Sequence, residues 1–156
     1  MKKLVYLISP NKIDQNFFTS LDKVLSFKNV KFFQLRLKNL SQKKLLNFSK
    51  RIIKITTKHK VKFIINDNFI LASKIKVDGC HMGQLDGSFK SARKKLKGKI
   101  LGITCHNSKI LANNAIENKA DYIAFGSFFK SRLKPSAKKA NLNILKWAKK
   151  NIKKPI

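Results

Sequence analysis

The chain has 156 residues, 43% of them hydrophobic, which is enough to bury the core of one domain. Its charge is extreme, because 36 basic residues stand against 7 acidic ones, for a formal net charge of +29. No apolar run approaches the roughly 20 residues needed to span a bilayer, and no export signal follows Met1. A cytoplasmic protein with a single domain over residues 1–156, and with no membrane partner, is therefore expected.

The net charge raises the question of a nucleic-acid partner. Only four of the basic residues are arginine, however, and the lysines are spread over every predicted helix instead of forming one stripe. Arginine is the residue expected for bidentate recognition of bases and phosphates. The lysines are therefore interpreted as a solvated coat, and no specific nucleic acid is expected as a partner.

Strands and helices are predicted in strict alternation along the chain. Ser41 and Asn141 are predicted N-caps, and Gly98 is the predicted end of the fourth helix. Such alternation predicts a parallel sheet with right-handed crossovers. The expected strands are Val5–Ile8, Lys31–Leu35, Val61–Ile65, Val77–His81, Lys99–Thr104 and Asp121–Phe125, and the expected helices are Asp14–Phe27, Ser41 to about His59, Asn68–Ile75, Ser88–Leu96, Ser108–Asn118 and Leu142–Asn151.

The last residues, Lys153 to Ile156, read as the entry to a seventh strand. The α/β class that fits is a (β/α)8 barrel of the TIM type, which takes about 250 residues. The chain then supplies only about six β/α units and lacks strands seven and eight. Unpaired strand edges favour association, so self-association through open sheet edges is expected.

Three polar clusters directly follow hydrophobic runs. They are Gln34-Leu35-Arg36-Leu37-Lys38, Asn66-Asp67 and the segment from Asp78 to Asp86. The carboxyl ends of parallel strands form the rim where such folds do their chemistry. Two cations, two carboxylates for a hard metal ion and several neutral polar groups are suited to binding a diphosphate. An enzyme is therefore predicted.

Each cluster also has a plainer interpretation. Strand alternation sends Gln34, Arg36 and Lys38 to one side, where they are either ligand-binding groups or a solvated strand edge. Asn66-Asp67 is equally typical of a strand-to-helix cap. The second carboxylate, Asp86, favours the functional interpretation, because two carboxylates with phosphate oxygens and water make a Mg²⁺ site.

In this order and spacing, the motifs Gln-x-Arg-x-Lys, Ile-Asn-Asp and Asp-Gly-x-His-x-Gly-Gln-x-Asp resemble those of the thiamine phosphate synthase family. The resemblance runs from about Val5 to Asn151 and includes Leu101-Gly102-Ile103-Thr104 and Ala120 to Gly126. It implies a (β/α)8 barrel and a transferase of thiamine biosynthesis. That reaction joins hydroxymethylpyrimidine diphosphate to thiazole phosphate, releasing pyrophosphate and leaving thiamine phosphate.

Residue by residue, the resemblance implies that Gln34 and Thr104 contact the pyrimidine. Arg36, Lys38 and Asn66 would hold the diphosphate, with Asp67 and Asp86 as ligands of Mg²⁺. Ser131 and Lys134 would bind the thiazole phosphate, although Leu133 replaces a hydroxyl residue of the family. Arg36, Lys38 and Lys134 are the groups assigned to catalysis.

Three alternatives remain at this point. A thiazole tautomerase-like protein has no need of the diphosphate and metal residues. A non-enzymatic module binding diphosphates or nucleic acid fits the charge. A zinc site from Cys80, His81, Asp86, Cys105 and His106 is disfavoured by the irregular spacing. His81 is interpreted as a packed strand-end residue, and His59 and His106 as ordinary polar residues.

Overall fold

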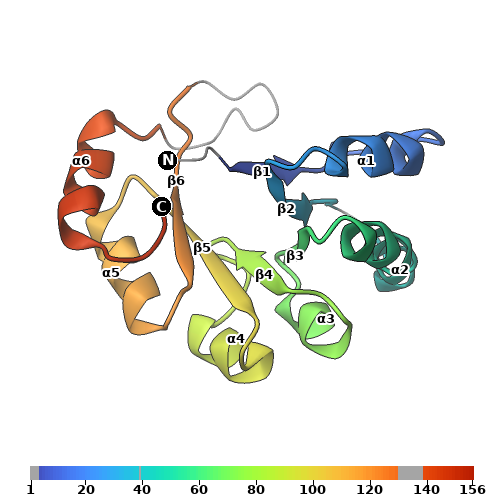
Figure 1. Cartoon of the computed structure of the whole chain (residues 1–156). Helices are drawn as coiled ribbons and strands as arrows, with labels where there is room; N and C mark the ends of the chain where they lie inside the picture. Colours follow the sequence, from blue (N-terminus) through green and yellow to red (C-terminus); the bar gives the residue numbers. More distant parts are fainter. Residues whose placement is uncertain (1–3, 39, 130–138) are drawn as a thin grey trace. The chain divides into compact units, whose positions relative to one another are not determined.

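The computed structural model describes residues 4–38, 40–129 and 139–156. In these residues six strands alternate with six helices, as the sequence predicts (Figure 1). The chain divides into two compact units, Met1–Cys80 and His81–Ile156, with the boundary inside one strand, β4 (Gly79–Met82). No helix in the described part of the chain is long and apolar enough to cross a membrane.

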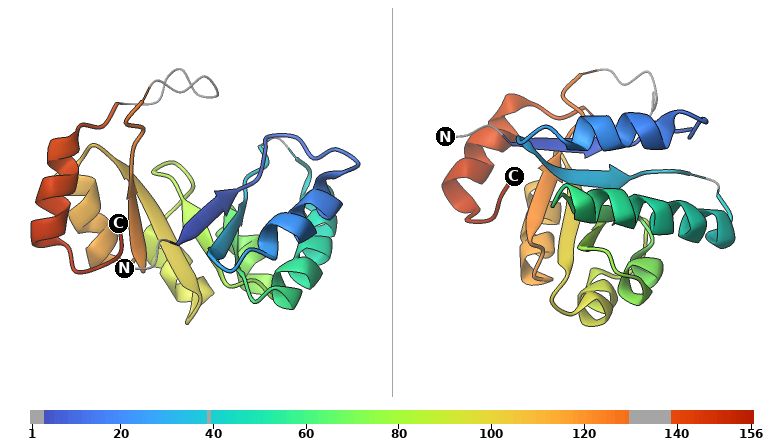
Figure 2. Two further views of the ribbon diagram at one scale, coloured as in Figure 1. Left: turned by 45° about the horizontal axis from the view of Figure 1, so that its top comes forward. Right: turned by 45° about the vertical axis from the view of Figure 1, so that its right-hand side comes forward.

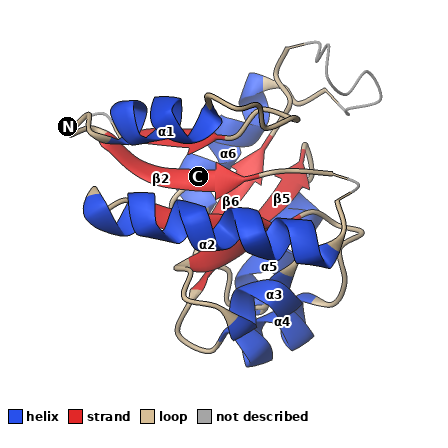
Figure 3. Ribbon diagram, turned by 90° about the vertical axis from the view of Figure 1, so that its right-hand side faces the viewer, coloured by secondary structure: helices blue, strands red, loops and turns tan. Residues whose placement is uncertain are grey.

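The first unit contains three parallel strands, β1 (Val5–Ile8), β2 (Val30–Leu35) and β3 (Lys62–Asn66). Its helices are α1 (Phe17–Leu25), α2 (Gln42–Lys58) and α3 (Phe69–Lys74). Figure 3 looks onto α1 and α2, which pack against each other beside this sheet. The parallel pairing brings the carboxyl ends of β2 and β3 to the same edge, where Leu35 lies opposite Ile65.

Aromatic side chains fill the core of the first unit. The rings of Phe17 and Phe33 are 6.3 Å apart, and those of Phe33 and Phe63 are 6.1 Å apart, distances typical of favourable aromatic pairs. Phe33 and Phe63 are each 1% exposed, because the sheet is covered by helices. The α2 helix also buries Ser49 and Thr56, whose hydroxyls donate to the carbonyls of Leu45 and Ile52 four residues earlier. These internal bonds explain why polar residues fit an apolar helix face.

The second unit contains the parallel pair β5 (Ile100–His106) and β6 (Tyr122–Phe125). Its helices are α4 (Phe89–Leu96), α5 (Lys109–Glu117) and α6 (Leu142–Asn151). Figure 2 shows α5 and α6 on the same side of β5 and β6. The buried residues of α5 are small, Ala112 and Ala115, so this helix can approach β5 closely. The α6 helix buries Ala148 and the larger Ile144.

Side-chain caps begin five of the described helices. The Ser41, Ser88 and Ser108 hydroxyls and the Asn68 and Asn141 amides each accept a backbone N–H from three residues onward. This bond satisfies one of the donors that a helix start leaves open, so the predicted caps Ser41 and Asn141 are confirmed. The helix predicted over Asp14–Phe27 is shorter, because Asp14 accepts the N–H of Asn16 in a turn before Phe17.

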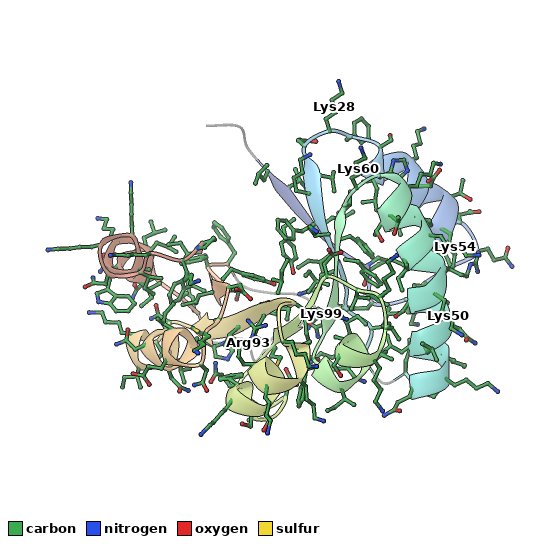
Figure 4. The ribbon with its side chains drawn as sticks, turned by 60° about the horizontal axis from the view of Figure 1, so that its bottom comes forward. Lys28, Lys50, Lys54, Lys60, Arg93 and Lys99 are labelled. Carbon is green, nitrogen blue, oxygen red and sulfur yellow. The ribbon has the colours of Figure 1, made fainter. Side chains whose placement is uncertain are left out.

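The end of α4 differs from the prediction. Lys97, not Gly98, takes the left-handed backbone conformation, with φ at 51°. Arg93 explains how a lysine is held there, since its guanidinium donates to the carbonyls of Lys97 and Lys99 on either side of the turn. Arg93 also pairs with Asp121, at 2.9 Å (Figure 4 labels Arg93 and Lys99).

In the described part of the first unit, the lysine side chains lie on the surface. Lys50 and Lys54 stand one turn apart on α2, and Lys28 and Lys60 lie in the loops after α1 and α2 (Figure 4). All four are exposed. A surface of this kind is typical of a solvated lysine coat.

Candidate active site

Gln34 lies in β2, opposite Ile8 of β1 and Ile64 of β3. It is only 3% exposed, and its amide nitrogen donates to the Tyr6 hydroxyl at 3.3 Å. A buried amide needs such a partner, and it keeps further hydrogen-bonding capacity because it has two donors and an acceptor. Gln34 is therefore a positioned, buried polar group among the apolar residues Phe33 and Leu35 of β2.

The β2 strand ends at Leu35, as predicted, and Arg36 and Lys38 follow it, so strand alternation does not fix the sides on which these two residues lie. The chain leaves the sheet because the Arg36 N–H donates to the Ser9 hydroxyl, at 2.9 Å, instead of to a strand. The Arg36 guanidinium lies 3.5 Å from the Asn11 amide oxygen. Arg36 is half-buried and Lys38 is exposed, so both cations belong to a loop at the carboxyl end of β2.

Asn66 and Asp67 sit where β3 turns into α3. Asn68, not either of these residues, caps the helix, since its side chain accepts the Leu71 N–H at 2.8 Å. The cap interpretation of the Asn66-Asp67 pair is therefore wrong. Asp67 has a left-handed backbone, with φ at 65°, a conformation that Asp and Asn tolerate better than most residues. Both side chains are half-buried.

Asp86 closes the loop that follows β4. One carboxylate oxygen accepts the Gly83 N–H at 2.6 Å, and a Cβ at position 83 would lie 3.0 Å from that oxygen. A glycine at 83 therefore lets the backbone approach the carboxylate closely. Leu85, between them in the loop, is 98% exposed, whereas Asp86 is half-buried.

Thr104 belongs to a hydrogen-bonded group in the second unit. Its hydroxyl lies 2.7 Å from Nε2 of His81, and the Nδ1 of the same ring lies 2.8 Å from the Tyr122 hydroxyl. Gln84 donates to the backbone carbonyl of Thr104 at 2.6 Å. The interpretation of His81 as a packed strand-end residue thus holds in part, because the ring is packed but also joins two hydroxyls.

The sequence prediction gave no role to Tyr122 or Gln84. Gly102, which lies opposite Tyr122 in the paired strands, is the residue that could have indicated the place of the Tyr122 ring. A Cβ at Gly102 would come within 2.0 Å of the Tyr122 ring, so only glycine leaves room for that ring. A glycine facing an aromatic residue across two strands often marks such a close approach.

Both cysteines are buried and free. Cys80 and Cys105 are each 0% exposed. Burial raises the pKa of the Cys105 thiol to about 12, so the thiol stays protonated near neutral pH. Within the described residues, no three His, Cys, Asp or Glu side chains are grouped as a metal site. Ser131 and Lys134 lie outside the described residues.

The geometry is that of an α/β protein with the β/α repetition of TIM-type barrels and with polar, charged residues following its strands. The family model described as thiamine monophosphate synthase matches residues 5–156. The thiamine-phosphate synthase of Pelagibacter ubique is 53% identical over 99% of this chain and 75% of its own length. The thiamine-phosphate synthase of Erythrobacter litoralis is 39% identical over 92% of this chain and 70% of its own length. The chain belongs to the thiamine monophosphate synthase family.

Solved structures support the fold. A thiamine phosphate pyrophosphorylase from Pyrococcus furiosus aligns with a TM-score of 0.83 over 99% of this chain and 72% of its own, at 23% identity. A 3-dehydroquinate dehydratase from Aquifex aeolicus aligns with a TM-score of 0.57, at 17% identity, over 78% of this chain and 67% of its own. Because one fold serves many chemistries, this second likeness concerns architecture alone. The family match does not favour the tautomerase-like or binding-module alternatives.

Proposed function

We propose that this chain acts as a thiamine phosphate synthase, joining hydroxymethylpyrimidine diphosphate to thiazole phosphate with release of pyrophosphate. The observation that carries the proposal is the 53% identity to a relative of that name over nearly the whole chain. Relatives of this identity usually share both fold and site chemistry. The finer fold assignment, a single (β/α)8-type domain over residues 1–156 with about six units in this chain, is part of the same proposal, as is a cytoplasmic location.

Arg36 and Lys38 are the proposed catalytic cations at the diphosphate. Loss of pyrophosphate builds negative charge on the leaving oxygens, and fixed cations stabilise that charge most where water is excluded. The half-buried guanidinium of Arg36 is suited to bidentate contact with phosphate, and the exposed Lys38 is free to reach a ligand as a point charge. Asn66 is the proposed neutral donor to the same diphosphate.

Asp67 and Asp86 are the proposed ligands of Mg²⁺. Carboxylates fit this ion, which in phosphate-transfer sites is commonly held by one or two of them together with substrate oxygens and water. Asp86 fits in particular because the Gly83 N–H fixes its carboxylate while leaving it half-buried and accessible. When bound, the ion neutralises charge on the leaving diphosphate.

Gln34 and Thr104 are the proposed contacts to the pyrimidine, and Ser131 and Lys134 to the thiazole phosphate. The positive pyrimidine carbon formed as pyrophosphate leaves is captured by the thiazole nitrogen. This step forms a carbon–nitrogen bond from the nitrogen lone pair and transfers no proton, so no general base is required. The buried amide of Gln34 suits recognition of a heteroaromatic ring, because such sites combine apolar walls with a few fixed polar groups.

The test is release of pyrophosphate by the purified chain in the presence of Mg²⁺. Release is expected only when both substrates are present, together with formation of thiamine phosphate. Lys38→Met should lower the rate about tenfold or more, whereas the matched variant Lys28→Met, which removes an exposed lysine elsewhere, should not. Tautomerisation of a thiazole phosphate without pyrophosphate release would instead support the tautomerase-like alternative.

A further inference from the structure

His81 joins two hydroxyl groups that come from neighbouring strands of the second unit. The hydroxyl of Thr104 in β5 lies 2.7 Å from Nε2 of His81, and the hydroxyl of Tyr122 in β6 lies 2.8 Å from Nδ1. The His81 and Tyr122 rings are also stacked, with centroids 5.5 Å apart. Two short bonds and a stacked ring fix the imidazole in one orientation, and Gly102 leaves the space that the Tyr122 ring needs.

In the hydrogen bonds that link Thr104, His81 and Tyr122, the position of each proton depends on the position of the others. A neutral imidazole carries one N–H donor and one acceptor nitrogen, whereas each hydroxyl can do either. If Nε2 donates to Thr104, then Tyr122 must donate to Nδ1. If Nδ1 donates to Tyr122, then the Thr104 hydroxyl must donate to Nε2.

The first arrangement matches the chemistry of the two hydroxyls. A phenol is the more acidic of the two and so the better donor, with a pKa near 10 in its ordinary state, while an aliphatic hydroxyl is the better acceptor. Tyr122 is therefore suited to donate to Nδ1, and Thr104 to accept from Nε2. The Thr104 hydroxyl hydrogen then points away from His81.

We propose that His81 is a positioning residue, which donates from Nε2 to Thr104 and so directs the Thr104 hydroxyl as a donor to a ring nitrogen of the pyrimidine substrate. The inference rests on the proposed function, because that function assigns Thr104 to the pyrimidine. Pyrimidine ring nitrogens are acceptors, so a hydroxyl that recognises one must donate. The Gln84 bond to the Thr104 carbonyl holds the backbone in place at the same position.

The binding test compares two ligands by calorimetry with Mg²⁺ present: hydroxymethylpyrimidine diphosphate and inorganic pyrophosphate. His81→Ala should weaken binding of the pyrimidine diphosphate about tenfold and leave pyrophosphate unchanged, because only the first ligand has a ring. His81→Gln, which offers an amide N–H in place of Nε2–H, should recover part of the loss. His59→Gln is the matched control in the first unit and should change neither affinity.

A double-mutant cycle separates positioning from general damage to the fold. Thr104→Val should also cost about tenfold in pyrimidine affinity, and adding His81→Ala to it should cost no more than about twofold, because the two residues act as one unit. Independent, multiplying losses would overturn the proposal. So would an equal loss of pyrophosphate affinity in His81→Ala.

Nitrogen NMR of the imidazole tests the proton arrangement without substrate. The His81 ring, assigned by its loss in His81→Ala, is expected in the Nε2–H tautomer near neutral pH, and an Nδ1–H tautomer would overturn the proposal. If the wild-type chain binds pyrophosphate as tightly as hydroxymethylpyrimidine diphosphate, the assignment of Thr104 to the pyrimidine is overturned, and with it the role of His81. Unchanged pyrimidine affinity in His81→Ala would overturn the role of His81 alone and leave the proposed function standing.

Discussion

Asp78 and Asp121 directly precede β4 and β6, whereas Asp67 and Asp86 follow β3 and β4. At the amino ends, the Asp78 carboxylate accepts the N–H of Phe63 in β3, and the Asp121 carboxylate accepts the N–H of Leu101 in β5, each at 2.8 Å. Each of these aspartates also donates its own N–H to the carbonyl of that same residue. The same arrangement thus occurs once in each unit.

A cation completes both amino-end arrangements. Lys62 pairs with Asp78 at 2.8 Å, and Arg93 with Asp121 at 2.9 Å. At the carboxyl ends, by contrast, Asp67 lies in a left-handed turn and Asp86 accepts a loop N–H. In barrels of this type the amino ends of the strands serve stability and the carboxyl ends serve chemistry. We therefore propose that position along the strand, not residue type, separates the structural aspartates Asp78 and Asp121 from Asp67 and Asp86 as ligand-binding aspartates.

The largest effect on stability is expected from Asp121→Ala. The substitution leaves the Leu101 N–H without its acceptor and removes the carboxylate from Arg93, whose side chain is only 18% exposed. A loss of about 2–3 kcal/mol in the free energy of unfolding is expected, measured by urea titration. Glu117→Ala, at an exposed helix position, is the control and should stay within about 0.5 kcal/mol. Equal effects of the two substitutions would contradict the structural role of Asp121.

Cys105 offers a readout within the same unit. Because its thiol is buried and its pKa is raised to about 12, it should resist thiol reagents near pH 8 until the unit opens. Asp121→Ala should therefore accelerate labelling of Cys105. Rapid labelling of this thiol in the native wild-type chain would contradict the burial.

A smaller effect is expected from Asp78→Ala in the first unit. The Phe63 N–H loses its acceptor here too, but the cation Lys62 is 56% exposed and returns to water at little cost. The free energy of unfolding should fall by about 1–2 kcal/mol. Lys62→Met should cost less than Asp78→Ala by the same urea titration. A larger cost for Lys62→Met would show that the ion pair, not the strand N–H, is the main contribution.

The smallest effect concerns Asp22 on α1, away from both strand ends. Hydrogen bonds from Lys58 and His59 lower the pKa of this carboxyl below its ordinary 3.8. A lowered folded-state pKa adds stability that is present above 3.8 and is lost as the pH falls through the folded-state value. The difference in unfolding free energy between wild type and Asp22→Asn should therefore shrink to zero on acidification. A difference that is constant from about pH 6 to pH 2 would contradict this linkage.

The order of strands and helices could be predicted because hydrophobic periodicity and cap residues are local signals. Ser41 and Asn141 are examples, since each cap bond spans three residues. The left-handed turn at Lys97 could not be predicted in this way, because the Arg93 side chain that bonds to its carbonyl also pairs with Asp121, which is distant in sequence. The exit of the chain at Arg36 likewise depends on Ser9, which is distant in sequence.

The candidate site shows the same limit. Residue types at strand ends indicated Gln34, Thr104 and the carboxylates, but the bonds of His81 to two hydroxyls require the pairing of β5 with β6. The roles of the site residues stay predictions. Sequence motifs identify which polar groups the chain contains, whereas the tertiary structure determines the partner with which each group forms a hydrogen bond.

We propose that Asp67, at the carboxyl end of a strand, binds ligand, whereas the aspartates at the amino ends of strands support the fold. Calorimetric titration of pyrophosphate, with and without Mg²⁺, tests it most directly in wild type, Asp67→Asn and the control Glu117→Gln. Asparagine also tolerates the left-handed backbone at φ 65°, so Asp67→Asn should fold as the wild type does. Mg²⁺ is expected to strengthen pyrophosphate binding in wild type and in Glu117→Gln. In the presence of Mg²⁺, Asp67→Asn should bind pyrophosphate about tenfold more weakly than wild type. Pyrophosphate binding that is indifferent to Mg²⁺, or unchanged in Asp67→Asn, would contradict it.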